Sequence, residues 1–170
     1  MPNEQARVDR AEARHEAISA AYVDHYRSIF GYVLTFTRSA TEAEDVVAQT
    51  FERALGAGTL PDPVTRAWLL LTARRIATDR WRRAQRLAKA IGRLAQTEPK
   101  HGQVDLEFWL WFDALSKALT PRQREVLVLR YQRDLTDEDI AEVMGLSASG
   151  VRSLTARALE TLRSHPELLP

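Results

Sequence analysis

The sequence lacks cysteine, long apolar runs and any cluster of histidines. Without cysteine the chain has neither a disulfide framework nor a thiolate metal site, which suits a reducing cytoplasm. No apolar stretch approaches the roughly 18 residues needed to span a bilayer, and the polar N-terminus lacks the apolar central segment of a secretion signal. His15, His25, His101 and His165 are too scattered for a metal site. We therefore expect a cytoplasmic chain with no membrane span, no metal and no cofactor.

Strand signals are also scarce, because the chain contains no Asn-Gly or Asp-Gly turn and no sustained period-two alternation. Apolar residues instead recur at spacings of three and four, which predicts an all-helical fold. A first helix is expected from about Ala13 to Thr37. Its apolar stripe consists of Ile18, Tyr22, Tyr26, Ile29, Tyr32, Val33 and Phe36.

Turn and capping residues divide the front half of the chain. Thr41, with Glu44 three residues later, predicts a capping box that opens a helix ending near Gly56 and Gly58. The stretch GAGTLPDPV holds two glycines and two prolines, so it predicts a loop. A third helix is expected to begin at about Thr65 and to continue into a basic run.

The pattern predicts two small helical domains joined by a flexible linker. Apolar periodicity fades after residue 90, where glycine, proline and polar residues accumulate. We expect a tail over residues 1–12, a first domain over 13–90, a linker over 91–104 and a second domain over 105–165. The second domain should contain a helix near Leu106 to Leu119 and another that starts at Thr120-Pro121, with proline at its first position.

The net charge of +1 conceals an uneven distribution of charge. Between residues 66 and 93 nine basic residues face a single acid, a local charge of +8. Two tryptophans lie in this run, and aromatic rings beside an electropositive track are how proteins hold single-stranded nucleic acid. The residues expected to bind DNA here are Trp68, Arg74, Arg75, Arg80, Trp81, Arg82 and Arg83.

Two plainer interpretations of this run remain open. A row of arginines is often only a solvated helix face, and Trp68 heads the apolar series Leu69 to Leu71, where it could belong to the core. Against the first, Arg74, Arg75, Arg82 and Arg83 have no local acids to neutralise them. Phosphates are their most plausible partners.

Near the C-terminus, the stretch TDEDIAEVMGLSASGVRSLTARALETLR predicts a helix-turn-helix. Thr136 caps the first helix with Asp139 three residues on, Gly145 permits a tight turn, and Ser147 caps the second helix. Ile140, Ala141, Val143, Leu146, Val151, Ala158 and Leu162 supply the core. Such a unit presents the start of its second helix to the major groove, although two helices around a glycine could equally form an ordinary hairpin. The residues expected to face duplex DNA are Ser147, Ser149, Gly150, Arg152, Ser153 and Arg157.

Three blocks, in this order and spacing, resemble the extracytoplasmic-function (ECF, group 4) sigma factors of the sigma-70 family. TEAEDVVAQTFERAL is similar to the region 2 helix that docks on the polymerase clamp coiled coil. AWLLLTARRIATDRWRR is similar to the helix that recognises and helps melt the minus-ten element. LTPRQREVLVLRYQRDLTDEDIAEVMGLSASGVRSLTARALETLR is similar to region 4, which reads the minus-thirty-five element and sits on the polymerase flap.

The resemblance implies a non-enzymatic factor that binds RNA polymerase core and directs promoter-specific initiation. It implies that Glu44, Asp45 and Gln49 contact the clamp, that Phe51 packs in the region 2 core, and that the loop from Gly56 to Thr65 captures a flipped base of the minus-ten strand. Its implied partners are core polymerase, duplex and melted promoter DNA, and, as for many members of the family, an anti-sigma factor. The free chain is expected to be a monomer.

Some positions depart from the family pattern. Ala48-Gln49 stands where Gln-Glu is frequent, Arg75 where asparagine is common, and Leu154 and Leu159 where basic residues are frequent. With leucine at these two positions, the recognition helix offers less positive charge to DNA than is usual in the family.

Two other function classes compete with this interpretation. An ordinary helix-turn-helix repressor or activator would shift operator DNA tightly by itself, whereas a sigma factor needs core polymerase, and the repressor hypothesis leaves the basic tryptophan-bearing helix without a role. A DNA-processing enzyme would need clustered carboxylates or an activated nucleophile, and the acids here lie on helix faces and caps.

Overall fold

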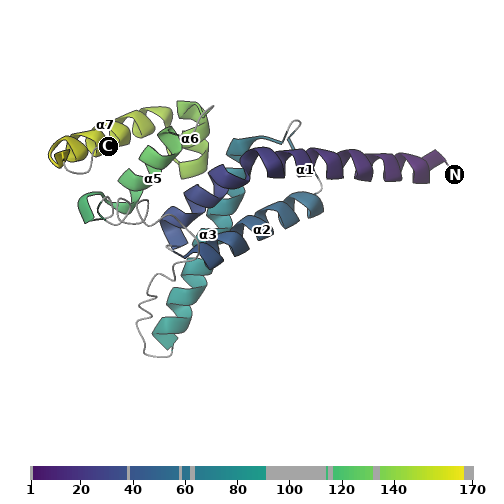
Figure 1. Ribbon diagram of the computed structural model, residues 1–170, viewed down its shortest axis with the longest axis horizontal. Helices are drawn as coiled ribbons and strands as arrows, with labels where there is room; N and C mark the ends of the chain where they lie inside the picture. Colours follow the sequence, from purple (N-terminus) through teal and green to yellow (C-terminus); the bar gives the residue numbers. More distant parts are fainter. Residues whose placement is uncertain are drawn as a thin grey trace.

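The computed structural model describes residues 2–37, 39–57, 59–61, 64–90, 114, 117–131 and 135–166. Within these ranges it contains helices and no strand, which confirms the all-helical prediction (Figure 1). The helices are α1 (Pro2–Thr37), α2 (Ala40–Gly56), α3 (Arg66–Ala90), α5 (Pro121–Arg130), α6 (Asp137–Met144) and α7 (Ala148–Arg163). None of the described helices is long and apolar enough to cross a membrane.

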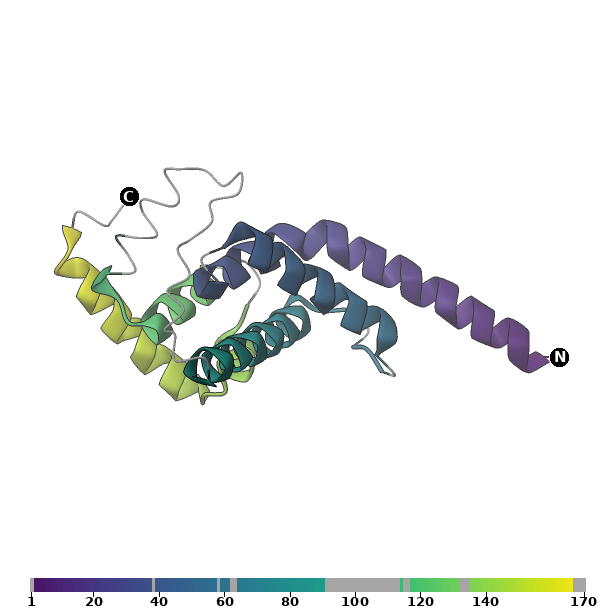
Figure 2. The same ribbon diagram turned by 90° about the horizontal axis from the view of Figure 1, so that it is seen from below.

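Helix α1 begins at Pro2, so the expected helix start at about Ala13 is wrong. The segment has no apolar stripe, but it is rich in Ala, Glu, Gln and Arg, which favour helix by backbone propensity alone. Proline at the first helical position is also compatible with helix. The N-terminal part of α1 is exposed and projects away from the other helices in both views (Figures 1 and 2).

Helix α2 begins earlier than predicted, because Ser39 is its N-cap in place of Thr41. The Ser39 hydroxyl accepts a hydrogen bond from the Glu42 backbone N–H at 3.3 Å. Thr41 lies inside the first turn, where its side chain is exposed. The end of α2 at Gly56 and the buried position of Phe51 agree with the predictions.

Helix α3 extends from Arg66 through the basic run, as predicted. The Thr65 hydroxyl accepts a hydrogen bond from the Trp68 N–H at 3.2 Å and so stabilises the first turn. The described residues between α2 and α3 contain no regular structure, as the glycines and prolines indicate. The buried face of α3 consists of Leu69, Leu70, Ala73, Ile76 and Ala77, all in its first half.

Helices α5, α6 and α7 pack on one another and form a second helical unit. Helix α5 starts at Pro121 under a capping box between Thr120 and Gln123, and the predicted caps of α6 and α7 at Thr136 and Ser147 are confirmed. The predicted linker over residues 91–104 lies outside the described residues. So does most of the helix expected near Leu106 to Leu119.

The two units, which we call the front module (α1–α3) and the rear module (α5–α7), lie in contact. Helix α5 contacts α1 and α6 contacts α3. The buried apolar side chains of both modules form one continuous cluster, which includes Ile29, Leu70, Val126 and Ile140. Figures 1 and 2 show the rear module beside the C-terminal half of α1, at the end opposite the projecting N-terminus.

Candidate nucleic-acid and polymerase interfaces

The second half of α3 carries the exposed part of the expected single-strand site. Trp81 is 63% exposed, and Arg82, Arg83 and Arg86 beside it are exposed as well. In Figure 1 this end of α3 projects away from the other helices. A solvent-exposed indole can stack against bases, and the arginines around it can neutralise phosphates.

Trp68, at the start of the same helix, lies in a different environment. Its ring is partly buried and packs against the apolar cluster of the molecule. This favours the core interpretation that the sequence left open for Trp68. The exposed surface of α3 is therefore centred on Trp81, more than three turns further along the helix.

Arg74 is not a free cation, because it pairs with an acid from a distant part of the chain. Its Nε donates to the Glu125 carboxylate on α5 at 2.6 Å, and its side chain is only 25% exposed. Tyr32 on α1 donates its hydroxyl to the same carboxylate oxygen at 2.9 Å. Burial alone would lower the pKa of Arg74, but the hydrogen bond and charge of Glu125 outweigh burial and raise it. Arg74 therefore remains cationic and is tied to the rear module.

Two other arginines of α3 also have acidic neighbours. Arg80 lies 3.3 Å from the carboxylate of Asp45 on α2, and Arg82 lies 3.9 Å from that of Asp79, one turn away. For Arg82 the expectation that no local acid pairs with it is therefore wrong. These pairs are exposed, so water and salt screen them strongly. For Arg75 and Arg83, no ion pair is found with any residue that the structure describes, and both side chains are exposed.

The residues expected to contact the polymerase clamp lie together on α2. Glu44, Asp45 and Gln49 are all exposed. Asp45 and Gln49 share one face of α2, and Glu44 lies at its border with the buried face of Val46, Val47 and Phe51. The spacing of the helix explains this separation of faces. Because Asp45 pairs with Arg80, the expected clamp surface and the expected DNA surface adjoin across the contact between α2 and α3.

The helix-turn-helix forms as the sequence predicts. Thr136 and Asp139 make a reciprocal capping box at the start of α6, with bonds of 2.9 and 3.0 Å. Gly145 adopts the left-handed conformation with φ of 64°, which glycine allows without penalty. The Leu146 N–H then donates to the Ala141 carbonyl at 2.9 Å and closes the end of the helix.

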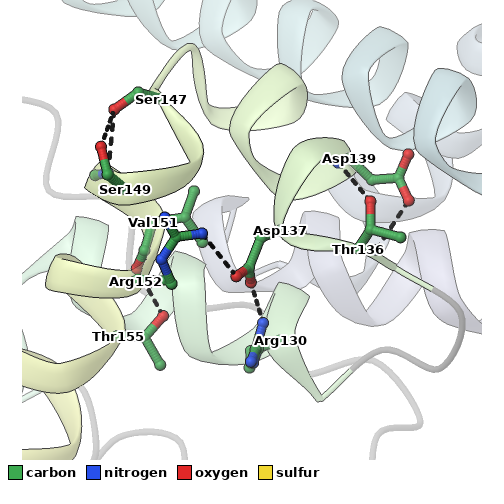
Figure 3. A network of polar contacts seen from close by, with 10 residues as sticks. Arg130, Thr136, Asp137, Asp139, Ser147, Ser149, Val151, Arg152 and Thr155 are labelled. Atoms are coloured by element: carbon green, nitrogen blue, oxygen red, sulfur yellow. Dashed lines mark hydrogen bonds and ion pairs between the residues drawn. The ribbon is translucent and has the colours of Figure 1, made fainter.

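The outward side chains of α7 lie where the sequence places them. Ser149, Arg152, Ser153 and Arg157 are exposed, while Val151, Ala158 and Leu162 are buried. The Ser147 hydroxyl caps α7 through the Gly150 N–H at 3.1 Å and lies 3.1 Å from the Ser149 hydroxyl (Figure 3). Leu154 and Leu159, at positions where basic residues are frequent in the family, are partly buried against the core. The exposed start of α7 is therefore polar, with Arg152 as its first cation.

Arg152 is held by an acid at the start of α6. Asp137 lies 3.5 Å from the Arg152 guanidinium and also pairs with Arg130 on α5 (Figure 3). Asp137 is only 18% exposed, so this small network links all three helices of the rear module. The Arg157 Nε donates to the Ser153 carbonyl of its own helix at 3.3 Å.

Sequence reasoning missed the polar residues that join distant segments. Glu125 is separated from Arg74 by 51 positions and from Tyr32 by 93, so no local pattern links them. One signal was available, because Glu125 stands four residues before Leu129 and hence on the same face of α5 as a core leucine. Asp137 and Arg130 were missed for the same reason, since their pairing depends on how α5 and α6 pack.

Comparison with known proteins identifies both modules. The model of sigma-70 region 2 matches residues 21–87, and that of sigma-70 region 4 matches residues 117–164. The first match covers about the second half of α1, all of α2 and most of α3, and the second covers α5 to α7. The surfaces described above therefore lie within regions 2 and 4.

Individual relatives agree over nearly the whole chain. The ECF RNA polymerase sigma factor SigL of Mycobacterium tuberculosis is 32% identical over 171 aligned positions, which cover 93% of this chain and 94% of SigL. Sigma factor RpoE, solved in complex with the anti-sigma factor NepR from Bartonella quintana, superposes with a TM-score of 0.68 at 22% identity, over 89% of this chain and 95% of RpoE. CnrH, solved with the cytosolic domain of CnrY, gives 0.65 at 24% identity over 96% of each chain. The chain belongs to the ECF sigma factors of the sigma-70 family, and its function is to bind RNA polymerase core and direct promoter-specific transcription initiation by recognising the minus-thirty-five and minus-ten elements.

Proposed function

We propose that this sigma factor uses three separate surfaces, one for melted DNA, one for duplex DNA and one for the polymerase clamp. The observation that carries the proposal is the exposed second half of α3. There the Trp81 side chain is solvent-exposed among arginines and is not part of the apolar core. Apolar burial does not explain an indole in that position, whereas stacking on a splayed base does.

The surface for melted DNA consists of Arg75, Trp81, Arg82 and Arg83. Their guanidinium groups would neutralise the backbone of the minus-ten strand while the indole stacks on a base. The irregular segment between α2 and α3 lies at the other end of α3 and would receive a base extruded from the duplex. Arg80 would join this surface when its exposed pair with Asp45 opens, because such pairs contribute little stability.

The surface for duplex DNA is the start of α7. Ser147, Ser149, Gly150, Arg152 and Ser153 occupy its first turns and are small or exposed, so the backbone can approach the major groove closely. The helix N-terminus adds a favourable interaction with phosphate. Arg157, further along the helix, would contact the sugar-phosphate backbone.

The clamp surface on α2 consists of Glu44, Asp45 and Gln49, and region 4 would rest on the polymerase flap. We propose that the chain acts as a monomeric adaptor in the cytoplasm, without catalysis of its own. RpoE and CnrH were solved with partner proteins, NepR and CnrY, the first of them an anti-sigma factor. A similar inhibitor that covers the DNA and polymerase surfaces would fit this chain as well.

The α3 surface is tested by Arg82→Ala combined with Arg83→Ala. We expect slower open-complex formation and a salt dependence that is flatter by about one unit of slope per lost phosphate contact. The matched control is Arg7→Ala with Arg10→Ala, which removes the same charge from the exposed, projecting part of α1. In vitro transcription with purified core polymerase over a salt series measures both. If the two double variants behave alike, α3 does not hold the strand.

The α7 surface is tested by Arg152→Ala. We expect weaker recognition of the minus-thirty-five element, by about 1 to 3 kcal/mol if Arg152 contacts a base, with core binding unchanged. Arg163→Ala is the control, since it lies exposed at the far end of the same helix. Footprinting of the upstream element with holoenzyme gives the readout. Equal footprints for both variants, or loss of core binding with Arg152→Ala, would contradict the assignment.

A further inference from the structure

Glu125 is a charged residue buried where the two modules meet. It is 3% exposed, and both of its hydrogen-bond donors, Tyr32 and Arg74, come from the other module. A buried carboxylate without such partners is strongly destabilising. Because both donors lie in the front module, Glu125 has these partners only while the modules are packed. The three groups therefore favour the packed arrangement specifically.

Tyr32 is suited to donating to a carboxylate. It is fully buried, and burial, reinforced by the charge and hydrogen bond of Glu125, raises its pKa well above the ordinary value. The phenol therefore keeps its proton at physiological pH. Tyr32 and the cationic Arg74 together bind the Glu125 carboxylate through one neutral and one charged donor.

The rest of the seam between the modules is less completely filled. A cavity of about 280 Å³ lies between α1, the start of α3 and α6. It is lined by His25, Thr65, Arg66, Ala67, Leu135 and Asp139. A seam with a cavity and a polar lining gains less from apolar burial than a close-packed core does, so it separates more readily.

The packed modules cannot contact both promoter elements at once. By their names the elements lie about 25 base pairs apart, which is about 85 Å of duplex at about 3.4 Å per base pair. Helix α3 has 25 residues and α7 has 16. At about 1.5 Å per residue they extend about 38 and 24 Å, so even end to end they are shorter than that separation. In the structure α6 contacts both α3 and α7 and so holds them close together.

We propose that the packed arrangement is a resting state in which Tyr32 and Arg74 of the front module hold Glu125 of the rear module, and that this carboxylate must be released before the chain engages a promoter. The inference rests on the function proposed above. In the resting state Arg74, one of the arginines expected to face DNA, is neutralised and three-quarters buried. Release would separate regions 2 and 4 and return Arg74 to the surface of α3.

The chain offers a direct test, because it contains no cysteine and two introduced cysteines can be labelled uniquely. Ala20→Cys on α1 and Ser164→Cys at the C-terminal end of α7 are both exposed and lie outside the proposed interfaces. Spin labels at these sites report the distance between the modules in the full chain. Into this background we would introduce Glu125→Gln, which keeps the side-chain volume but removes the charge that Arg74 requires.

We expect Glu125→Gln to raise the separated fraction by about tenfold or more, as loss of a hydrogen bond to a charged group implies. The control is Glu138→Gln, the same change at an exposed position of the same module, and it should leave the distance distribution unchanged. Tyr32→Phe removes one donor and should act in the same direction with a smaller shift. Circular dichroism confirms that each variant retains its helices, and if Glu125→Gln does not fold, Tyr32→Phe decides.

Transcription with core polymerase separates this inference from the proposed function. The contact of Glu125 with Tyr32 and Arg74 is the proposed latch between the modules. If the chain transcribes but neither Glu125→Gln nor Tyr32→Phe changes the distance distribution relative to Glu138→Gln, the latch is refuted and the proposed function stands. If the chain does not transcribe with any core polymerase, the proposed function fails, and the distance measurement still decides whether Glu125 holds the modules together. A latch also predicts half-maximal transcription at a lower concentration of Glu125→Gln than of the parent.

Discussion

Adding one methyl group to a glycine should have opposite effects on stability at two positions of this chain. Gly145 has a φ of 64°, in the left-handed region, whereas Gly31 lies inside α1. A Cβ at either position would meet nothing within 4 Å, so steric overlap does not enter the comparison. Only the backbone conformation differs. Gly145→Ala and Gly31→Ala therefore test whether the turn of the helix-turn-helix depends on that conformation.

The magnitudes follow from this difference. A left-handed conformation costs an alanine about 1 to 2 kcal/mol, partly offset by about 0.4 to 1 kcal/mol because alanine restricts the unfolded chain. Gly145→Ala should thus destabilise the rear module by roughly 1 kcal/mol, about a fivefold change in the folding constant. Gly31→Ala should instead stabilise α1 by up to about 1 kcal/mol, because alanine is the better helix former.

Hydrogen exchange of the amides in α1, α6 and α7, followed by mass spectrometry, measures each effect where it arises. Gly145→Asn is a useful intermediate, since asparagine tolerates the left-handed region better than alanine does. We expect protection of α6 and α7 to decrease in the order Gly, Asn, Ala. Destabilisation by Gly31→Ala, or stabilisation by Gly145→Ala, would refute the backbone argument.

Two further predictions concern capping and pH. Thr136→Ala should destabilise the chain by about 1 kcal/mol in urea denaturation, because it removes the cap of α6. Thr41→Ala should change stability by no more than about 0.5 kcal/mol, because Thr41 is exposed and does not cap α2. Burial, followed by the nearby charge of Arg66, lowers the pKa of His25 below 6.5, so the unfolded chain takes up a proton before the folded chain does. Stability should therefore decline as pH falls through about 6.5, and His25→Gln should remove part of that decline while the exposed His15→Gln should not.

The parts of the structure that sequence predicted well depend on neighbouring residues. Thr136, Gly145 and Ser147 form their hydrogen bonds and turns within a few positions, so their residue types alone define the start and end of α6 and the start of α7. The apolar periodicity of α7 likewise identified which side chains are buried and which face outward.

The errors arose where two local signals compete or where the partner is distant. Ser39 and Thr41 are both good caps, and each is followed three residues later by a glutamate, so the local pattern fits either start and α2 uses Ser39. The tail before Ala13 has helical propensity without an apolar stripe, so a search for periodicity overlooks it. The pairing of Arg74 with Glu125 depends on how the modules pack, which no spacing in the sequence encodes.

The contact between Asp137 and Arg152 has a consequence for how α7 would meet DNA. A long arginine side chain normally loses rotamer freedom when it binds, at roughly 0.5 to 1.5 kcal/mol per side chain. Arg152 already has a preferred direction, because Asp137 is fixed from its other side by Arg130. One carboxylate shared by two arginines leaves a net charge of +1, so the group still attracts phosphate. If Arg152 contacts a base, as proposed, it would bind with part of this ordering cost already met.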